Sequence, residues 1–233
     1  MRALACLAAL AMSLGPTLAA AAKVDPKNPS CPLQPNWGAT APMKFTLDSR
    51  DGRRVLLAEG MVDDNLVPRL EAALKANEPI DEIWIRSPGG NARVGNQAGR
   101  IIRGAMIPTR IPKDWACFSA CNFVFMGGAA RFVDAGGLFI VHMFTHTGNR
   151  GVIEAEVLRG TESTVGLIGE IEQESAMLAS EDNDFLIRMG VSRKLLTELM
   201  YRQKAVAEQG GDASTRRCLT QVEVWKYNVA NAR

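Results

Sequence analysis

Apolar and polar positions follow two different spacings in the first part of the chain. Residues 43–48 ("MKFTLD") and 53–60 ("RRVLLAEG") are short apolar runs separated by a Ser-Arg-Asp-Gly stretch, which predicts two strands joined by a turn. Residues 63–77 instead carry leucine and alanine three and four positions apart, which predicts a helix. Pro68 falls near the start of this helix, where proline is tolerated.

Strand and helix patterns continue to alternate through the middle of the chain. The runs at residues 81–86 ("DEIWIR") and 136–144 ("GGLFIVHMF") have the length and apolarity of buried strands, and residues 91–105 have the pattern of a helix. This alternation predicts βαβ units and a mostly parallel sheet. Functional groups in such sheets lie beyond the carboxyl ends of the strands, so the Gly89-Gly90 loop and the stretch around Ser119 are the places to search for chemistry.

The C-terminal part of the chain has a predominantly helical pattern. Residues 152–205 are predicted to be helical, and a last helix is expected to start at Thr220, with Glu223 in capping-box spacing. Residues 23–42 are rich in proline and are expected to form an irregular lead. The patterns therefore predict a single α/β domain over residues 43–233, with a helical C-terminal segment.

Residues 1–22 have the features of an export signal. Arg2 precedes a short apolar stretch, a Gly-Pro break follows, and small residues lead to a cleavage site after Ala20 or Ala22. The apolar stretch is shorter than the ~20 residues that span a bilayer, and no second segment of that length follows. The expected mature protein is therefore a chain of ~210 residues without a membrane span, periplasmic or secreted.

The charge of the chain is nearly balanced. It has 27 lysine and arginine residues against 25 aspartate and glutamate residues, a formal net charge of +2. Acidic and basic residues are interspersed along the sequence. This composition disfavours nucleic acid or an anionic membrane as a partner.

An even number of cysteines remains after the leader, as expected where disulfides persist: Cys31, Cys117, Cys121 and Cys218. Four cysteines allow three pairings, and the sequence does not choose among them. A bridge between Cys117 and Cys121 requires Cys117 to lie outside the helix, because β-carbons four positions apart on a helix are ~5–6 Å apart and a disulfide needs ~3.5–4.5 Å. The alternative is a pair of small buried thiols.

The stretch "ACFSACNFVFMGG" at residues 116–128 places Ser119 directly ahead of an apolar run. A serine becomes a nucleophile when a general base, usually histidine, takes its proton. His142 ends a predicted strand, which would bring its ring to the sheet edge that holds Ser119, whereas His146 lies in a polar turn and is expected to be solvated. The alternatives are a helix cap for the serine and a structural role for the histidine.

Backbone amides near these residues are candidate donors to an oxyanion. Glycine lets the backbone approach a ligand closely, so Gly89 or Gly90 is one candidate. Ala120 follows the candidate nucleophile at the start of a helix and offers a second N–H. The alternative for "SPGG" at residues 87–90 is an ordinary type II turn.

Four segments, in this order, resemble the proteolytic subunit of Clp proteases: "RRVLLAEGMVDDNLVPRLEAAL", "IDEIWIRSPGGNARVGNQAGRII", "CFSACNFVFMGGAARFVDAGGLFIVHMF" and "RRCLTQVEVWKYNVAN". They are more similar still to exported, periplasmic Clp-protease-like relatives within the crotonase-like superfamily. The resemblance covers residues 53–144 well and the C-terminal residues loosely. It implies a ββα superhelix, peptidase activity on a peptide or protein substrate without a cofactor, and assembly into rings.

The resemblance also assigns roles to individual residues. It places the nucleophile at Ser119, the general base at His142, and the oxyanion donors at the amides of Gly89 and Ala120. The cysteines beside Ser119 depart from the family, which has small residues there.

The acid of the expected triad has several candidates. Alignment of "DASTRRCLT" with the acid-bearing segment of the family puts it at Asp212, although the helical segment before it is longer than in the family. Asp182 and Asp184 are rivals. Each of the three also has an ordinary interpretation, as a loop aspartate, a helix cap or a solvated charge.

These observations favour an exported serine hydrolase, specifically a peptidase that needs no ATP because export separates it from cytoplasmic ATPases. A noncatalytic crotonase-like scaffold that binds peptides is the alternative, and thioester chemistry on acyl-CoA ranks last because CoA is cytoplasmic. A thiol nucleophile at Cys117 or Cys121 is disfavoured by an oxidising compartment. No metal is expected, and apolar residues at 167, 168 and 171 favour either a homo-oligomer or packing within the chain.

Overall fold

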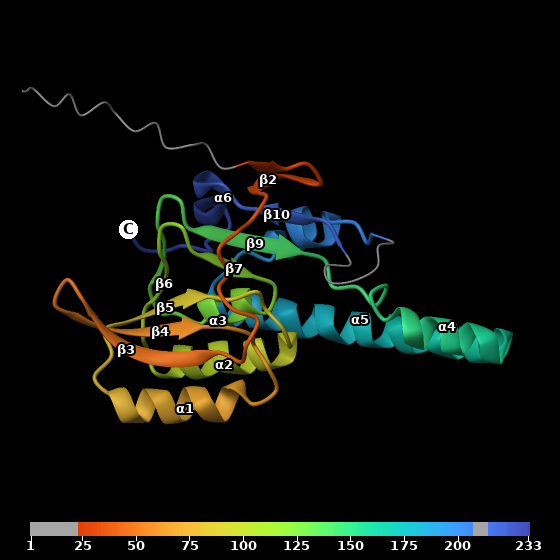
Figure 1. The fold of residues 1–233 in the computed structure, drawn as a ribbon, viewed down its shortest axis with the longest axis horizontal. Coiled ribbons are helices and arrows are strands. Elements are labelled where there is room, and N and C mark those ends of the chain that lie inside the picture. The colour runs from red at the N-terminus through yellow and green to blue at the C-terminus, as the bar shows by residue number, and fades with distance from the viewer. Residues whose placement is uncertain (1–22, 207–213) are drawn as a thin grey trace, which may run out of the picture.

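The structure is a computed structural model that describes residues 23–206 and 214–233. The predicted leader, residues 1–22, and Asp212 lie outside the described residues. Two sheets and the helices around them form the body of the molecule, and a long helical hairpin extends from it (Figure 1). Within the described ranges, no helix is both long enough and apolar enough to cross a membrane.

The larger sheet has five strands in the order β3-β4-β5-β6-β8. Strand β3 pairs antiparallel with β4 through the predicted turn, and β4, β5, β6 and β8 are parallel. The prediction of an α/β fold with a mostly parallel sheet is confirmed for these strands. They are β3 (Lys44–Arg50), β4 (Arg53–Glu59), β5 (Glu82–Arg86), β6 (Thr109–Ile111) and β8 (Arg131–Val133).

Two helices connect the first parallel strands. In α1 (Leu66–Asn77) the leucines at helical spacing are buried, as the pattern predicts. Helix α2 (Ala92–Gly104) begins at Asn91, whose side chain accepts a hydrogen bond from the amide of Val94 and so caps the helix.

Glycines in α2 allow it to lie very close to α3 (Cys121–Met126). A β-carbon at Gly95 would lie 2.5 Å from the carbonyl oxygen of Ala120, and one at Gly99 would lie 2.3 Å from that of Phe123. No side chain fits at these distances. The glycine loop and its helix are therefore held directly against the segment that carries Ser119.

Three further strands form a separate sheet in the order β10-β9-β7. Strands β7 (Ala116–Phe118) and β9 (Leu138–His142) are parallel, and β10 (Arg216–Cys218) is antiparallel to β9. The sequence predicts one sheet, whereas the structure divides these strands between two sheets. An isolated backbone bridge between Ser87 and Cys117 connects the two sheets. Pro88 follows this bridge and has no N–H with which to continue the pairing.

The prediction of an irregular lead over residues 23–42 is wrong in part, because this region contains a hairpin of β1 (Val24–Asp25) and β2 (Asn28–Pro32). A disulfide between Cys31 and Cys218 attaches the hairpin to β10. Asp25 also accepts a hydrogen bond from the guanidinium of Arg216 at 2.9 Å. Long-range contacts, which a proline-rich composition does not reveal, hold this segment in place.

The helical segment predicted over residues 152–205 is interrupted twice, at Gly160 and Gly190, which have φ angles of 111° and 67°. Its parts are α4 (Arg150–Arg159), α5 (Thr161–Met189), a π-helical segment η1 (Leu195–Leu199) and a 3₁₀ turn η2 (Met200–Arg202).

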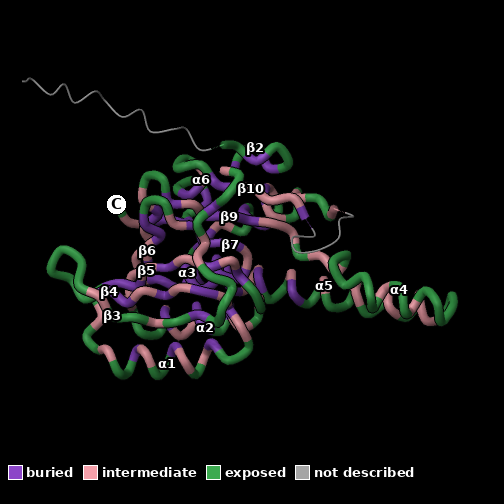
Figure 2. Tube along the Cα trace, viewed as in Figure 1, coloured by how far each residue is buried: buried purple, intermediate pink, exposed green. Residues whose placement is uncertain are grey.

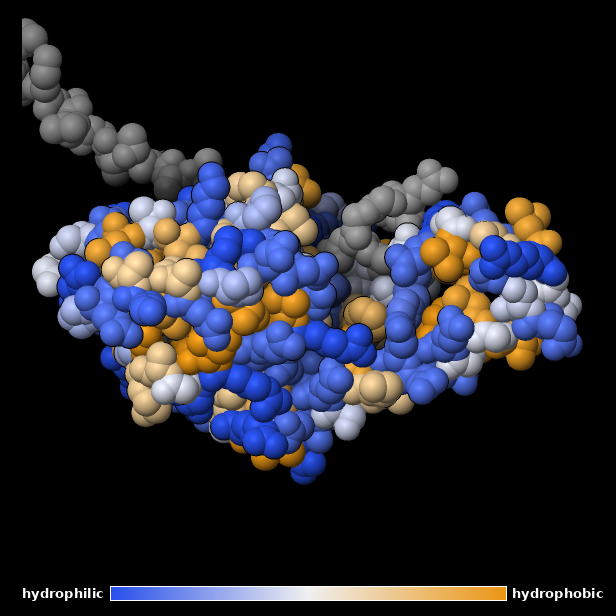
Figure 3. Space-filling view, turned by 90° about the horizontal axis from the view of Figure 1, so that it is seen from below, coloured by the Kyte–Doolittle hydropathy of each residue, from blue (hydrophilic) through white to orange (hydrophobic). Residues whose placement is uncertain are grey.

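The hairpin of α4 and α5 is the most exposed part of the fold. Figure 2 shows that α4 and the adjoining part of α5 are largely exposed, while α5 is buried where it approaches the sheets. Hydrophobic side chains are visible at the outer end of this hairpin (Figure 3), and the exposed ones along α4 and the first part of α5 are Val152, Val157, Leu158, Val165 and Ile168. Leu167 and Ile171 are partly buried.

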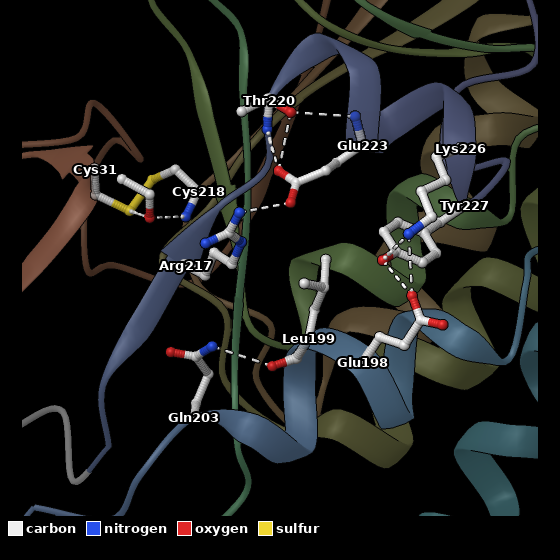
Figure 4. Close-up of polar contacts among 11 residues, drawn as sticks. Cys31, Glu198, Leu199, Gln203, Arg217, Cys218, Thr220, Glu223, Lys226 and Tyr227 are labelled. Carbon is white, nitrogen blue, oxygen red and sulfur yellow. Dashed lines mark hydrogen bonds and ion pairs between the residues drawn. A yellow bond between two sulfur atoms is a disulfide. The ribbon is translucent and has the colours of Figure 1, made fainter.

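The C-terminal helix α6 (Gln221–Lys226) has the predicted cap. The hydroxyl of Thr220 accepts a hydrogen bond from the amide of Glu223, and the carboxylate of Glu223 accepts one from the amide of Thr220 (Figure 4). Glu223 also binds Arg217 of β10 at 2.6 Å. These contacts fix α6 to the strand that is bridged to Cys31.

Removing the bridge between Cys31 and Cys218 should destabilise the fold by ~5 kcal/mol, because it closes a loop with a sequence separation of 187. The bridge between Cys117 and Cys121 has a separation of 4, and the same relation gives ~2 kcal/mol. We expect Cys31→Ala with Cys218→Ala to lower the urea midpoint more than Cys117→Ala with Cys121→Ala. Equal midpoints for the two double variants would contradict this assignment.

Candidate active site

Ser119 lies on a sharp turn between strand β7 and helix α3. Its φ angle is 59°, in the left-handed region that non-glycine residues rarely adopt. Cys117 on the strand and Cys121 at the start of the helix form a disulfide with a Cα–Cα distance of 5.4 Å. Cys117 lies outside the helix, as a bridge between these two cysteines requires. The disulfide links the strand before Ser119 to the helix after it, and so constrains the turn that presents the hydroxyl.

The hydroxyl of Ser119 is hydrogen-bonded to the imidazole of His142. The distance from Ser119 Oγ to His142 Nε2 is 2.7 Å. Parallel pairing of β7 with β9 explains this contact, because it brings the carboxyl ends of both strands to the same edge. The ring of Phe118 packs beside the imidazole, with 4.6 Å between the ring centroids, and restricts its orientation.

The other imidazole nitrogen contacts a serine. Ser214 Oγ lies 3.0 Å from His142 Nδ1, and Ser214 is 4% exposed. When Nδ1–H donates to this hydroxyl, Nε2 has a free lone pair that can accept the proton of Ser119. Ser214 can therefore select the reactive tautomer, but unlike a carboxylate it brings no negative charge to stabilise an imidazolium ion.

The three candidate acids have different positions. Asp212 lies outside the described residues. Asp184 has a half-exposed side chain and forms ion pairs with Arg100 at 3.1 Å and Arg188 at 2.8 Å, so it is held in a surface network. Asp182 is buried and lines the same cavity as Ser119, but it makes no hydrogen bond to His142.

The pKa of His142 is lowered to about 4, chiefly because burial disfavours the charged imidazolium and also because of the positive charge of Arg216. Arg216 of β10 lies opposite His142 of β9 in the antiparallel register of these strands. The imidazole is therefore neutral at physiological pH, which is the form a general base requires.

The double-glycine loop lies directly against the nucleophile. A β-carbon at Gly89 would be 2.5 Å from Cβ of Ser119 and 3.1 Å from the amide nitrogen of Ala120. The amide of Gly89, an expected oxyanion donor, donates to Ser87 Oγ at 3.0 Å in this conformation. Gly90 and Ala120 line the cavity beside Ser119, and their amides have no acceptor among the described residues.

A cavity of about 530 Å³ opens in front of Ser119 and His142. Its apolar walls come from α3, η2, α5 and the segment after β9, and include Phe123, Phe144, Leu178 and Met200. A cavity of this size and composition can hold a side chain of a peptide. His146, which the sequence predicts to be solvated, is instead partly buried beside it, 3.5 Å from Glu174 and edge-on to Phe144.

Comparisons with known proteins agree with the fold. No protein-family model matches the sequence, and no curated protein matches it. The chain is similar to the structure of a point mutant of ClpP1 from Listeria monocytogenes, with a TM-score of 0.51 and 16% sequence identity over 76% of this chain and 89% of that chain. The fold is Clp-protease-like. ClpP1 from the same organism has a TM-score of 0.49 and 17% identity over the same shares of the two chains.

The Clp-protease-like fold accounts for the arrangement of strands, while the roles of individual residues depend on the geometry of this chain. Sequence reasoning missed Ser214, although it lies in "DASTRRCLT", two positions after Asp212. A triad leads one to expect a charged residue at this place, and the sequence has no feature that marks a neutral hydroxyl as the partner of a histidine. The sequence also did not indicate that Asp182 lines the cavity.

Proposed function

We propose that the protein is an exported serine hydrolase, a peptidase that acts without ATP through an acyl-enzyme. The observation that carries this proposal is the 2.7 Å hydrogen bond between Ser119 Oγ and His142 Nε2 at the wall of a cavity. The left-handed turn at Ser119 presents the hydroxyl to that cavity. The proposed nucleophile is Ser119 and the proposed base is His142.

In the proposed reaction, Ser119 Oγ attacks the carbonyl carbon of a peptide bond while its proton passes to His142 Nε2. The oxyanion is stabilised by the amide of Ala120 and by the Gly89-Gly90 loop. The carbon–nitrogen bond then breaks, and Nε2 gives its proton to the leaving amine. Water, deprotonated by the same nitrogen, hydrolyses the acyl-enzyme and restores the serine.

Export is supported by two features. The sequence of residues 1–22 resembles a signal peptide, and the two disulfides are of a kind that persists in oxidising compartments. We therefore assign the protein to the periplasm or the extracellular space. The exposed apolar side chains at the outer end of the α4–α5 hairpin support assembly with further copies of the chain.

A noncatalytic scaffold that binds peptides is the second candidate. It is favoured by the low pKa of His142, which makes transfer of a proton to the imidazole less favourable. The distance between Ser119 and His142 favours the hydrolase, because a scaffold does not need to hold these groups within hydrogen-bond reach.

Labelling with a fluorophosphonate probe separates the two candidates. We expect the folded wild-type protein to form a covalent adduct, because the probe reacts with a serine that a neighbouring base activates, and we expect Ser119→Ala to form none. Intact-mass spectrometry and peptide mapping identify the modified residue.

Ser192→Ala is a matched control, since Ser192 lies after α5 and its hydroxyl accepts from the amide of Lys194. It should label as fast as the wild type. Folded wild-type protein that stays unlabelled, or a Ser119→Ala variant that labels equally well, would refute the hydrolase assignment.

A further inference from the structure

Asp182 is a buried carboxylate for which the described part of the chain supplies no ion-pair partner. It lies on α5, is 5% exposed, and its Oδ1 has no hydrogen-bond partner among the described residues. Burial of a charged group is costly unless another group compensates for the lost hydration. An unpaired acid at such a position therefore requires an explanation.

Other buried acids of this protein are paired. Glu82, which is 1% exposed, binds Arg110 at 3.0 Å, and Asp25, which is 6% exposed, binds Arg216 at 2.9 Å. The fold thus compensates buried carboxylates with arginine elsewhere. Among the described residues no arginine compensates Asp182 in this way, and a positively charged group of a ligand could take that place.

Asp182 is placed to meet such a ligand. It lines the cavity that contains Ser119 and His142, and it also lines an adjoining cavity of about 430 Å³. The walls shared by the two cavities are Phe144, Thr145, Leu178, Asp182 and Met200. A side chain that enters beside Ser119 would follow apolar walls until it reaches the carboxylate.

The other ionisable groups near Asp182 do not neutralise it. Arg93 lines the first cavity but binds Glu181 at 3.3 Å, and Glu174 lies 3.5 Å from His146. Tyr201 of η2 lines the second cavity, and the charge of Asp182 contributes to its raised pKa of about 12, after burial. His142, which also lines the first cavity, is neutral at physiological pH.

We propose that Asp182 recognises a cationic side chain of the substrate, so that the protein cleaves after lysine or arginine. An aliphatic stem ending in a positive charge fits apolar walls that lead to one carboxylate. This proposal rests on the proposed peptidase activity and specifies its substrate class. Asp182 is a group for binding and specificity, separate from the proton transfers at Ser119.

Burial, together with the negative charge of Glu181, raises the pKa of Asp182 to about 7. The free carboxyl is therefore neutral below this pH and ionised above it. A cation binds the ionised form, so its affinity should decrease about tenfold for each pH unit below about 7. His142 stays neutral in this range, because its pKa is about 4.

The first test compares fluorogenic peptides that differ only in the residue that supplies the scissile carbonyl, lysine or its uncharged analogue norleucine. At pH 8 we expect the wild type to prefer lysine by at least about tenfold in kcat/KM, and Asp182→Asn to lose this preference while it still cleaves the norleucine peptide. Asp184→Asn, a matched change two positions along α5 on a half-exposed side chain, should keep the preference. A wild type that prefers norleucine, or an Asp182→Asn variant that loses both activities equally, would refute the proposal.

A second test does not depend on catalysis. Calorimetry with Ser119→Ala measures the binding of benzamidine, a cation, and benzamide, its neutral counterpart. We expect benzamidine to bind more tightly, and we expect Asp182→Asn in this background to remove the difference. If benzamidine binds in this way but the wild type hydrolyses no peptide, the cation site is supported and the peptidase proposal is refuted. If the wild type hydrolyses peptides but Asp182→Asn leaves the affinity for benzamidine unchanged, the peptidase proposal is supported and the cation site is refuted.

The folding of Asp182→Asn can be checked directly. Because the pKa of this carboxyl is raised from 3.8 to about 7 on folding, the free energy of unfolding falls as the pH rises between these two values and stays at its lowest above about pH 7. The variant should therefore have a higher melting temperature than the wild type at pH 8. A lower melting temperature at pH 8 would contradict an unpaired carboxylate at this position.

Discussion

Replacement of His142 by alanine is expected to lower kcat/KM by about 10⁴-fold, because Ser119 then loses the imidazole that takes its proton. The effect should appear in kcat and in the rate of fluorophosphonate labelling. Steady-state kinetics on a cleaved peptide and the time course of labelling measure it. His146→Ala is the control, since its imidazole contacts Glu174 rather than Ser119, and it should retain most of the activity.

The pH dependence of the wild type gives an independent check of this base. A lowered pKa means that His142 becomes protonated, and loses its function, only as the pH falls through about 4. We expect activity on a norleucine peptide to persist from pH 7 down to about 5. An acid limb near pH 6.5, the ordinary range of histidine, would show that the imidazole is less buried than the structure indicates.

Gly89→Ala is expected to lower kcat by at least about 10²-fold. Its new β-carbon would lie 2.5 Å from Cβ of Ser119 and 2.6 Å from the carbonyl oxygen of Phe118, at a φ angle of 90° that alanine rarely adopts. The nucleophile and the glycine loop must therefore move apart. Peptide kinetics, together with thermal melting to confirm that the variant is folded, measure the effect.

Gly166→Ala is the matched control for this substitution. Gly166 lies in α5, where a β-carbon would meet nothing within 4 Å, and alanine favours the helix. We expect unchanged activity and equal or greater stability. Unchanged activity in Gly89→Ala as well would indicate that the loop has no part in the reaction.

The contact between Ser119 and His142 could be anticipated from the sequence because it follows from the strand pattern. The apolar run that ends at His142 predicted a strand that brings its ring to the sheet edge holding Ser119, and the parallel pairing of β9 with β7 brings these residues together. The pattern did not reveal that these strands form a sheet of their own. That division depends on where pairing stops, near Pro88, and not on local propensity.

The third group of the site could not be anticipated in the same way. Ser214 reaches His142 because β10 pairs antiparallel with β9, and β10 is fixed by a bridge to a hairpin in a region expected to be irregular. This chain of long-range contacts leaves no periodic signal. Asp182 was similarly hidden, because the helical spacing of α5 does not indicate which of its acids faces a cavity.

The separation of 72 positions between His142 and Ser214 determines when the site becomes complete. A growing polypeptide contains Ser119 and His142 long before it contains Ser214 and Cys218. Until Ser214 has been made and Cys218 has joined Cys31, the imidazole lacks its contact with the Ser214 hydroxyl. The contacts of the proposed base are therefore completed only by residues far along the chain and by oxidation of two cysteines.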